Sequence, residues 1–220
     1  MVSLTIDGKK VKVPAGTTLL EAAREANIHI PTLCYLPEVQ AIGACRVCLV
    51  EIEGNRALQA SCVFPAAEGL VVRTHSRKVQ EARKFTVEML LSAHPQDCLV
   101  CVKNRKCELQ KLAEELGIRE VRFQGEKPKG RIDDSNPSVV RDASKCILCR
   151  RCVTVCQEVQ QVGALSAQER GFDTYIGPAF GDEMGEVSCA LCGQCINVCP
   201  VGALSEKDYT AEVWKAIHDP

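Results

Sequence analysis

The sequence predicts an α+β fold built from three small domains. Three observations support this prediction: a strand-turn-strand pattern followed by a helix opens the chain, a helical stretch ending in a histidine and a cysteine group follows, and a duplicated cysteine-rich run comes last. The 220 residues include fifteen cysteines, but only 4% are aromatic. Small domains with so few large rings need further stabilisation, which disulfides or bound metals can supply.

Residues 1–75 are expected to form a β-grasp domain. Two short apolar strands flank Asp7-Gly8, a strong hairpin signal. Thr18 and Glu21 then form a capping-box pattern that opens a helix ending near Asn27. Returning strands are expected at residues 47–52 and 70–73, and the segment from Cys34 to Cys48 reads as a loop.

Helical spacing of apolar residues, Phe85 and Met89 among them, predicts a helix from Ser76 as N-cap to the break at His94-Pro95. A second helix after Cys107 completes a small domain at residues 76–123. Gly, Pro, Asp, Asn and Ser mark residues 124–137 as a linker. A third domain is expected at residues 138–208, and residues 209–220 form a short amphipathic helix or tail.

The third domain contains an internal repeat. CILCRRCVTVC and CALCGQCINVC have the same cysteine spacing, and each is followed by the same GALS segment, expected as a strand. The repeat predicts pseudo-twofold symmetry.

Each run has the C-x2-C-x2-C-x3-C spacing of bacterial ferredoxins, in which the fourth cysteine binds the other cluster. Pro200 follows the second run as in that pattern, whereas Gln157 follows the first. Four-thiolate zinc sites remain the alternative interpretation. The predicted 4Fe-4S ligand sets are Cys146, Cys149, Cys152 and Cys199 for one cluster, and Cys156, Cys189, Cys192 and Cys195 for the other.

The N-terminal cysteines follow C-x10-C-x2-C-x13-C, which is near the plant-type 2Fe-2S spacing with a longer first gap. Gly43 and Ala44 carry little side chain, which suits a backbone that wraps a cluster closely and donates N–H groups to sulfur. Buried structural cysteines are the alternative. The predicted 2Fe-2S ligands are Cys34, Cys45, Cys48 and Cys62.

A further set has the unusual spacing H-x3-C-x2-C-x5-C. Its histidine precedes three cysteines that otherwise lack a fourth ligand, whereas His29, His75 and His218 read as ordinary core or surface residues. A neutral imidazole in place of a thiolate removes one negative charge and should raise the reduction potential. The predicted ligands of this third 4Fe-4S cluster are His94, Cys98, Cys101 and Cys107.

The composition also indicates the cellular compartment and the kinds of partner expected for the chain. Its start has no apolar signal core and no later run is long enough to span a membrane, so we expect a cytoplasmic chain with reduced thiols. An odd number of cysteines argues against a closed disulfide framework. The formal net charge of −1 becomes roughly −8 once thiolates and four cluster cores are counted. Nucleic acid is therefore an unexpected partner, and basic protein surfaces are expected ones.

The motifs resemble a known family. MVSLTIDGKKVKVPAGTTLLEAA with CRVCLVEIEG, then HPQDCLVC, and then the two C-x2-C-x2-C-x3-C runs are similar to the N-terminal iron-sulfur region of FeFe hydrogenases. They are also similar to alpha subunits of multimeric NAD(P)-dependent hydrogenases and formate dehydrogenases, and to the complex I large iron-sulfur subunit. The likeness covers about residues 1–208, and all sixteen ligands named above match the family's pattern.

The resemblance implies one 2Fe-2S and three 4Fe-4S clusters in an electron-transfer subunit of a cytosolic, electron-bifurcating hydrogenase or transhydrogenase. The implied partners are a flavoprotein that oxidises NAD(P)H, a small thioredoxin-like 2Fe-2S subunit, and ferredoxin or a catalytic redox subunit, in a hetero-oligomeric complex. The chain has no G-x-G-x-x-G nucleotide motif and no cysteine left for a catalytic cluster. The alternative is the N-terminal part of a hydrogenase or formate dehydrogenase whose catalytic domain is absent from this chain.

Overall fold

The computed structural model describes residues 1–128 and 131–219 and confirms the α+β fold class. The chain divides into two compact units: residues 1–99 with 103–127, and residues 100–102 with the chain from 128 onward. Residues 129 and 130 of the predicted linker and residue 220 of the predicted tail lie outside the described residues. The division into three domains therefore stays a prediction.

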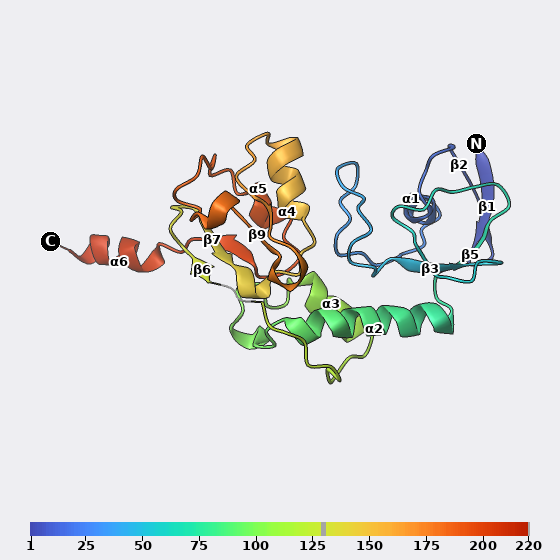
Figure 1. Cartoon of the computed structure of the whole chain (residues 1–220), viewed down its shortest axis with the longest axis horizontal. Helices are drawn as coiled ribbons and strands as arrows, with labels where there is room; N and C mark the ends of the chain where they lie inside the picture. The colour runs from blue at the N-terminus through green and yellow to red at the C-terminus, as the bar shows by residue number, and fades with distance from the viewer. Residues whose placement is uncertain (129–130, 220) are drawn as a thin grey trace. The chain divides into compact units, whose positions relative to one another are not determined.

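The first unit contains a five-stranded mixed sheet in the order β2-β1-β5-β3-β4 (Figure 1). The edge hairpin turns at Asp7 and Gly8, whose φ angles of 46° and 81° match the type I′ turn that this pair favours. Strand β1 pairs in parallel with β5, while the other strand pairings of this sheet are antiparallel. The strands are β1 (Val2–Ile6), β2 (Lys9–Val13), β3 (Leu49–Ile52), β4 (Gln59–Ala60) and β5 (Val71–Arg73).

Helix α1 (Leu19–Glu25) packs its buried leucines and alanines into one apolar core with the sheet. The Thr18 side chain accepts the N–H of Glu21 at 3.3 Å, as the capping box predicted. Asn27, just after the helix, has φ 55°, which ends the helix as expected. Hairpin, helix and returning strands therefore form the predicted β-grasp arrangement.

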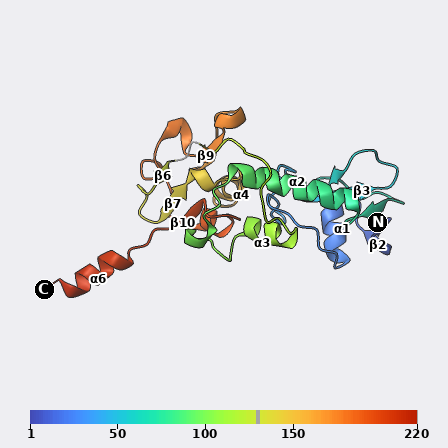
Figure 2. The ribbon, with the colours of Figure 1, turned by 90° about the horizontal axis from the view of Figure 1, so that it is seen from below.

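Helix α2 (Arg77–Ala93) begins at its predicted cap, Ser76, and packs beside α3 (Glu108–Glu115) (Figure 1 and Figure 2). Its buried face agrees only in part with the apolar spacing, which correctly indicates the buried Val79 and Val87. Phe85 and Met89 are exposed, whereas Arg83 and Glu88 are buried. The charged pair can be buried because each finds partners: Arg83 binds backbone carbonyls, and Glu88 binds Arg122 at 2.7 Å.

The second unit contains a three-stranded sheet in the order β10-β7-β6 and a separate hairpin, β8-β9. Within the segment predicted as a linker, residues 132–133 form a strand, and Asp133 and Asn136 are buried. Although the composition of this segment is typical of linkers, hydrogen bonds of Asp133 and Asn136 hold it in an ordered structure. The strands are β6 (Ile132–Asp133), β7 (Val139–Asp142), β8 (Ser166–Gln168), β9 (Tyr175–Gly177) and β10 (Leu204–Glu206).

The cysteine repeat folds as two similar turns into short helices, α4 (Arg151–Thr154) and α5 (Gln194–Asn197). The symmetry is incomplete after the helices. The first run continues into a π-helical turn, η3 (Val155–Val159), whereas Pro200 ends the second. The second GALS segment enters β10 beside β7, but the first contributes only Ser166 to β8, which pairs with β9.

Short one-turn helices connect several of these elements: η1 (Cys98–Val100), η2 (Ala143–Lys145), η4 (Gly171–Asp173) and η5 (Ala179–Gly181). The last element, α6 (Thr210–His218), has no buried residue among those described, although its sequence is amphipathic as predicted. Across residues 1–128 and 131–219, none of the helices has the length and apolar character needed to cross a membrane.

Candidate functional site

The first cysteine set lies where the loop before β3 meets the segment after β4. Cys34, Cys48 and Cys62 are buried and Cys45 is half-buried. The Gln40 amide donates to the Cys34 carbonyl at 2.5 Å and holds the long loop closed. The structure therefore brings together the four cysteines that the sequence assigned to a 2Fe-2S cluster.

These four thiols are arranged as two pairs. The Cys48 and Cys62 sulfurs are 3.4 Å apart, and Cys45 forms a side-chain hydrogen bond with Cys34. The hydrogen bond with Cys62 lowers the pKa of Cys48, while the same bond and burial raise the pKa of Cys62. In the other pair, the bond to Cys34 and burial raise the pKa of Cys45. Two pairs fit a two-iron group in which each iron takes two thiolates.

Backbone N–H groups already point at these sulfurs. Gly43 donates its N–H to Cys62, and Val47 donates to Cys45. Gly43 has φ 62°, and a Cβ there would lie 3.3 Å from a methyl group of Val63. The glycine allows the close backbone approach that the sequence predicted.

A buried arginine that sequence reasoning missed supports this loop. Arg83 of α2 donates to the Val47 carbonyl at 3.0 Å, to the Leu49 carbonyl at 3.1 Å and to the Thr74 carbonyl at 3.4 Å. Its charge also acts on Cys48. A charged residue on the inner face of a helix gave no signal in the apolar pattern, because the pattern treats it as solvent-facing.

Three residues of the second set lie in the first unit, between the end of α2 and the start of α3. His94 caps α2 and is 9% exposed, and Lys127 donates to its carbonyl at 2.8 Å. Cys98 begins η1, and Cys107 caps α3, where its sulfur accepts the N–H of Gln110 at 3.5 Å. Cys101 belongs to the segment 100–102, which groups with the second unit. The ligand role of this set stays a prediction.

The other eight cysteines surround two cavities in the second unit. Four of them line one cavity together with Arg141, Ile147 and Leu165. The other four line the second cavity together with Leu165 and Met184. The first cavity is lined by Cys146, Cys149, Cys152 and Cys199, and the second by Cys156, Cys189, Cys192 and Cys195. Each cavity thus combines three cysteines of one run with the fourth of the other.

The repeat explains this arrangement locally. Leu148 and Arg150 have φ values of 55° and 60°, and the matching positions Leu191 and Gly193 have 56° and 68°. These left-handed residues turn the chain around the cavities so that N–H groups face sulfur. Leu148 donates to Cys146 at 3.4 Å, and the N–H groups of Arg151 and Ile196 donate to Cys149 and Cys195.

Burial dominates the protonation of four of these eight thiols. It raises the pKa of Cys146 to about 11 and the pKa values of Cys149 and Cys195 to about 12. The pKa of Cys152 is also raised, by burial and by the neighbouring thiols. Such thiols keep their protons at neutral pH, so binding a metal group must release protons from the site.

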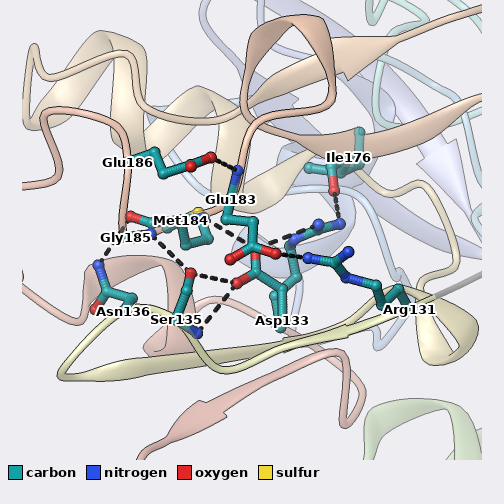
Figure 3. A network of polar contacts seen from close by, with 10 residues as sticks. Arg131, Asp133, Ser135, Asn136, Ile176, Glu183, Met184, Gly185 and Glu186 are labelled. Atoms are coloured by element: carbon teal, nitrogen blue, oxygen red, sulfur yellow. Dashed lines mark hydrogen bonds and ion pairs between the residues drawn. The ribbon is translucent and has the colours of Figure 1, made fainter.

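A polar network joins the walls of the two cavities (Figure 3). The Asp133 carboxylate accepts the N–H of Met184 at 2.9 Å and one guanidinium nitrogen of Arg141 at 3.4 Å. It also accepts the Ser135 hydroxyl at 2.6 Å, and the Asn136 amide donates to the Met184 carbonyl at 3.2 Å. Sequence reasoning missed Asp133, Ser135 and Asn136 because they lie in the segment whose composition indicated a linker.

All fifteen cysteines are free of disulfides. Within the described residues, no three His, Cys, Asp or Glu side chains converge closely enough to hold a single metal ion. The cysteines instead form pairs in the first set and line cavities in the last two. Cysteine sulfur lining cavities whose walls are mostly apolar, with backbone N–H donors already in place, fits an iron-sulfur cluster.

Comparison with known families assigns each part of the chain to an iron-sulfur module. Residues 1–77 match the 2Fe-2S iron-sulfur cluster binding domain, and residues 83–122 match the NADH-ubiquinone oxidoreductase-G iron-sulfur binding region. Residues 136–205 match the ferredoxin-like domain of NADH-quinone oxidoreductase subunit 3. Both 2Fe-2S and 4Fe-4S binding modules are therefore present.

Individual relatives agree. The chain is 47% identical over its whole length to the NADP-reducing hydrogenase subunit HndD of Solidesulfovibrio fructosivorans, of which it spans 38%. It is 37% identical over 97% of its length to the mitochondrial NADH-ubiquinone oxidoreductase 78 kDa subunit of Neurospora crassa, of which it spans 29%. A chain in the crystal structure of an NAD+-reducing [NiFe]-hydrogenase in the H2-reduced state superposes with a TM-score of 0.87 at 35% identity, covering 94% of this chain and 87% of that one.

Proposed function

Because the chain belongs to the iron-sulfur family shared by complex I-type large iron-sulfur subunits and NAD(P)-linked hydrogenase subunits, we propose that it relays single electrons through four clusters. One 2Fe-2S cluster and three 4Fe-4S clusters, one of them with a histidine ligand, account for all sixteen predicted ligands. Iron-sulfur clusters supply one-electron redox chemistry, and the protein contributes ligands, hydrogen bonds and burial.

The observation that carries this proposal is the pair of four-cysteine cavities in the second unit. Leu165 is 1% exposed and lines both cavities, so a single buried side chain contributes to the walls of both. Cys152 and Cys195, one from each set, are close enough for their charges to interact. Two redox groups held this closely support electron transfer between them better than separate structural roles.

The chain's own residues would hold and tune these groups. The pairs Cys34 with Cys45 and Cys48 with Cys62 would each bind one iron, and Gly43 would donate its N–H to a ligand sulfur. In the second unit, most side chains lining the two cavities are apolar, and Cys192 is the exposed cysteine of the second cavity. Cys156 of the first run lines the second cavity and Cys199 of the second run lines the first, so each cluster would link the two half-repeats.

We assign the chain to a complex that links NAD(P)H and a second redox couple. Its electrons would pass between a flavoprotein partner and ferredoxin or another redox subunit, with a small thioredoxin-like 2Fe-2S subunit in the same assembly. Electron bifurcation in such a complex is part of this proposal. Because fifteen thiols must stay reduced, the proposed location of the complex is the cytoplasm, which fractionation of the source cells would test.

A second function is favoured by the relative with 47% identity, which is named as a hydrogenase subunit and is much longer than this chain. In this alternative the chain is the N-terminal part of an FeFe hydrogenase or a formate dehydrogenase. Assays of the native complex with hydrogen, formate or NADPH as the donor and a dye as the acceptor would distinguish the two functions.

The experiment that tests the relay is an anaerobic reductive titration followed by electron paramagnetic resonance. We expect several distinct paramagnetic centres on reduction, and loss of their signals when an oxidised one-electron acceptor is added. The matched variants Cys199→Ser and Cys156→Ser should each perturb a different 4Fe-4S signal. A chain that shows no paramagnetic centre after full reduction would contradict the proposal.

A further inference from the structure

Arg141 lies in the wall of the first four-cysteine cavity without belonging to any predicted ligand set. It stands in β7, opposite Leu204 of β10 and Asp133 of β6. Its side chain is only 12% exposed, and it lines the cavity together with Cys146, Cys149, Cys152 and Cys199. The charge of Arg141 acts on Cys146, so the guanidinium is near the ligand sulfurs.

Two of the three guanidinium nitrogens are held in place. Nη1 donates to the Ile176 carbonyl at 3.1 Å, and Nη2 contacts the Asp133 carboxylate at 3.4 Å. Gly177 provides room for the group, since a Cβ there would lie 3.2 Å from Nη1 and 3.3 Å from Cζ. Arg141 therefore has a defined orientation, which a solvated surface arginine lacks.

The third nitrogen is different. Nε of Arg141 is buried and has no hydrogen-bond partner in the part of the chain that the structure describes. A buried N–H without an acceptor costs free energy, so such groups are rare in native proteins and each one requires an explanation. In the wall of this cavity, the missing acceptor is available in the sulfur atoms of a cluster and its thiolate ligands.

We propose that Arg141 tunes the cluster held by Cys146, Cys149, Cys152 and Cys199, donating its Nε–H to a sulfur and raising the reduction potential of that cluster. This inference rests on the proposed function, because it requires the cluster. A hydrogen bond to sulfur and a nearby positive charge both stabilise the reduced state, which carries one more negative charge.

The same network gives the second cavity a different environment. Asp133 faces both Arg141 and the backbone of Met184, and Met184 lines the cavity of the other cluster. The wall of one cavity therefore contains the Arg141 guanidinium and the wall of the other contains the Met184 thioether, although the cysteine motifs are nearly identical. Arg141 thus separates the potentials of two clusters that the repeat alone would make similar.

The test is a redox titration of the full chain with all clusters present, comparing Arg141→Lys and Arg141→Met with the wild type. We expect the midpoint potential of one 4Fe-4S signal, assigned by its change in Cys146→Ser, to become more negative. The shift should be larger for methionine, which removes both the donor and the charge, than for lysine, which keeps the charge. Arg150→Gln is the matched control, because Arg150 lines the same cavity but is exposed, so solvent screens its charge.

Iron and sulfide are counted in the same samples, which separates this inference from the proposed function. Wild-type protein without clusters would contradict the function. Arg141 variants that keep all clusters and show unchanged midpoint potentials would overturn the proposed role of Arg141 and leave the proposed function of the chain intact. A purely structural role predicts loss of stability without a shift in potential.

A second measurement leaves Arg141 in place and so does not depend on how well the variants fold. Because the charge of Arg151 also acts on Cys149, the protein carrying both Arg150→Gln and Arg151→Lys is labelled with 15N only in its arginine guanidinium groups and reduced. Electron-nuclear double resonance should then show a 15N coupling on the cluster signal that Cys146→Ser perturbs. A reduced cluster without such a coupling would overturn the proposal.

Discussion

Replacing Asp133 by asparagine should destabilise the second unit strongly, although the two side chains have the same shape. The carboxylate is 1% exposed and accepts four hydrogen bonds. One oxygen accepts the N–H and hydroxyl of Ser135, at 3.3 and 2.6 Å, and the other accepts from Met184 and Arg141, at 2.9 and 3.4 Å. Burial opposes ionisation, but these donors outweigh it and hold the pKa of Asp133 below its usual range.

The magnitude follows from counting acceptors. Asparagine has one acceptor oxygen, so its amide nitrogen must face two of the donors in either orientation. Two lost hydrogen bonds to a charged group, at about 1.5–3 kcal/mol each, give a loss of about 3–6 kcal/mol. For a unit of this size, a loss of about 3 kcal/mol corresponds to a fall of about 12–24 °C in melting temperature.

The assay is anaerobic thermal bleaching of the visible cluster absorbance at a fixed scan rate, because cluster loss makes unfolding irreversible. Asp134→Asn is the matched control, since Asp134 is adjacent and exposed, and it should shift the midpoint little. Equal midpoints for Asp133→Asn and Asp134→Asn would refute the reasoning that the network holds this unit together.

Three further results are expected. Arg83→Met removes three hydrogen bonds to backbone carbonyls and should lower the unfolding free energy of the first unit by about 3–5 kcal/mol in a denaturant titration. The exposed Arg77→Met should leave the denaturation midpoint almost unchanged, and equal shifts for the two variants would contradict this. Thr18→Ala should cost about 1 kcal/mol through the lost cap, and no change in the denaturation midpoint would contradict the capping role. Because burial raises the pKa values of Cys146 and Cys149 to about 11 and 12, cluster binding must release protons, so iron retention against a chelator should increase from about pH 6.5 to about pH 8.5; retention that falls with pH would contradict this.

Much of the fold could be predicted because local signals are strong where few conformations compete. Asp7-Gly8 fixes the first turn, and Thr18 and Ser76 cap their helices as the pattern indicated. The cysteine spacing also predicted which residues the second unit brings together, including the crossing of Cys156 and Cys199. Short-range spacing encodes these features directly.

What the sequence did not predict depends on long-range polar contacts. Arg83, Asp133 and Arg141 are charged residues whose partners lie far along the chain or on the backbone, and hydropathy treats each as solvent-facing. The strand at residues 132–133 was missed for the same reason, since its order depends on Asp133 rather than on apolar periodicity. The boundaries of the three predicted domains and the ligand roles of His94 and of the fifteen cysteines stay predictions.

The central claim is that this chain holds four iron-sulfur clusters as an electron relay. Anaerobic analysis of iron, acid-labile sulfide and zinc in the purified protein tests it most directly. One 2Fe-2S and three 4Fe-4S clusters predict about 14 iron and about 14 sulfide per chain. Stoichiometric zinc without sulfide would contradict the account.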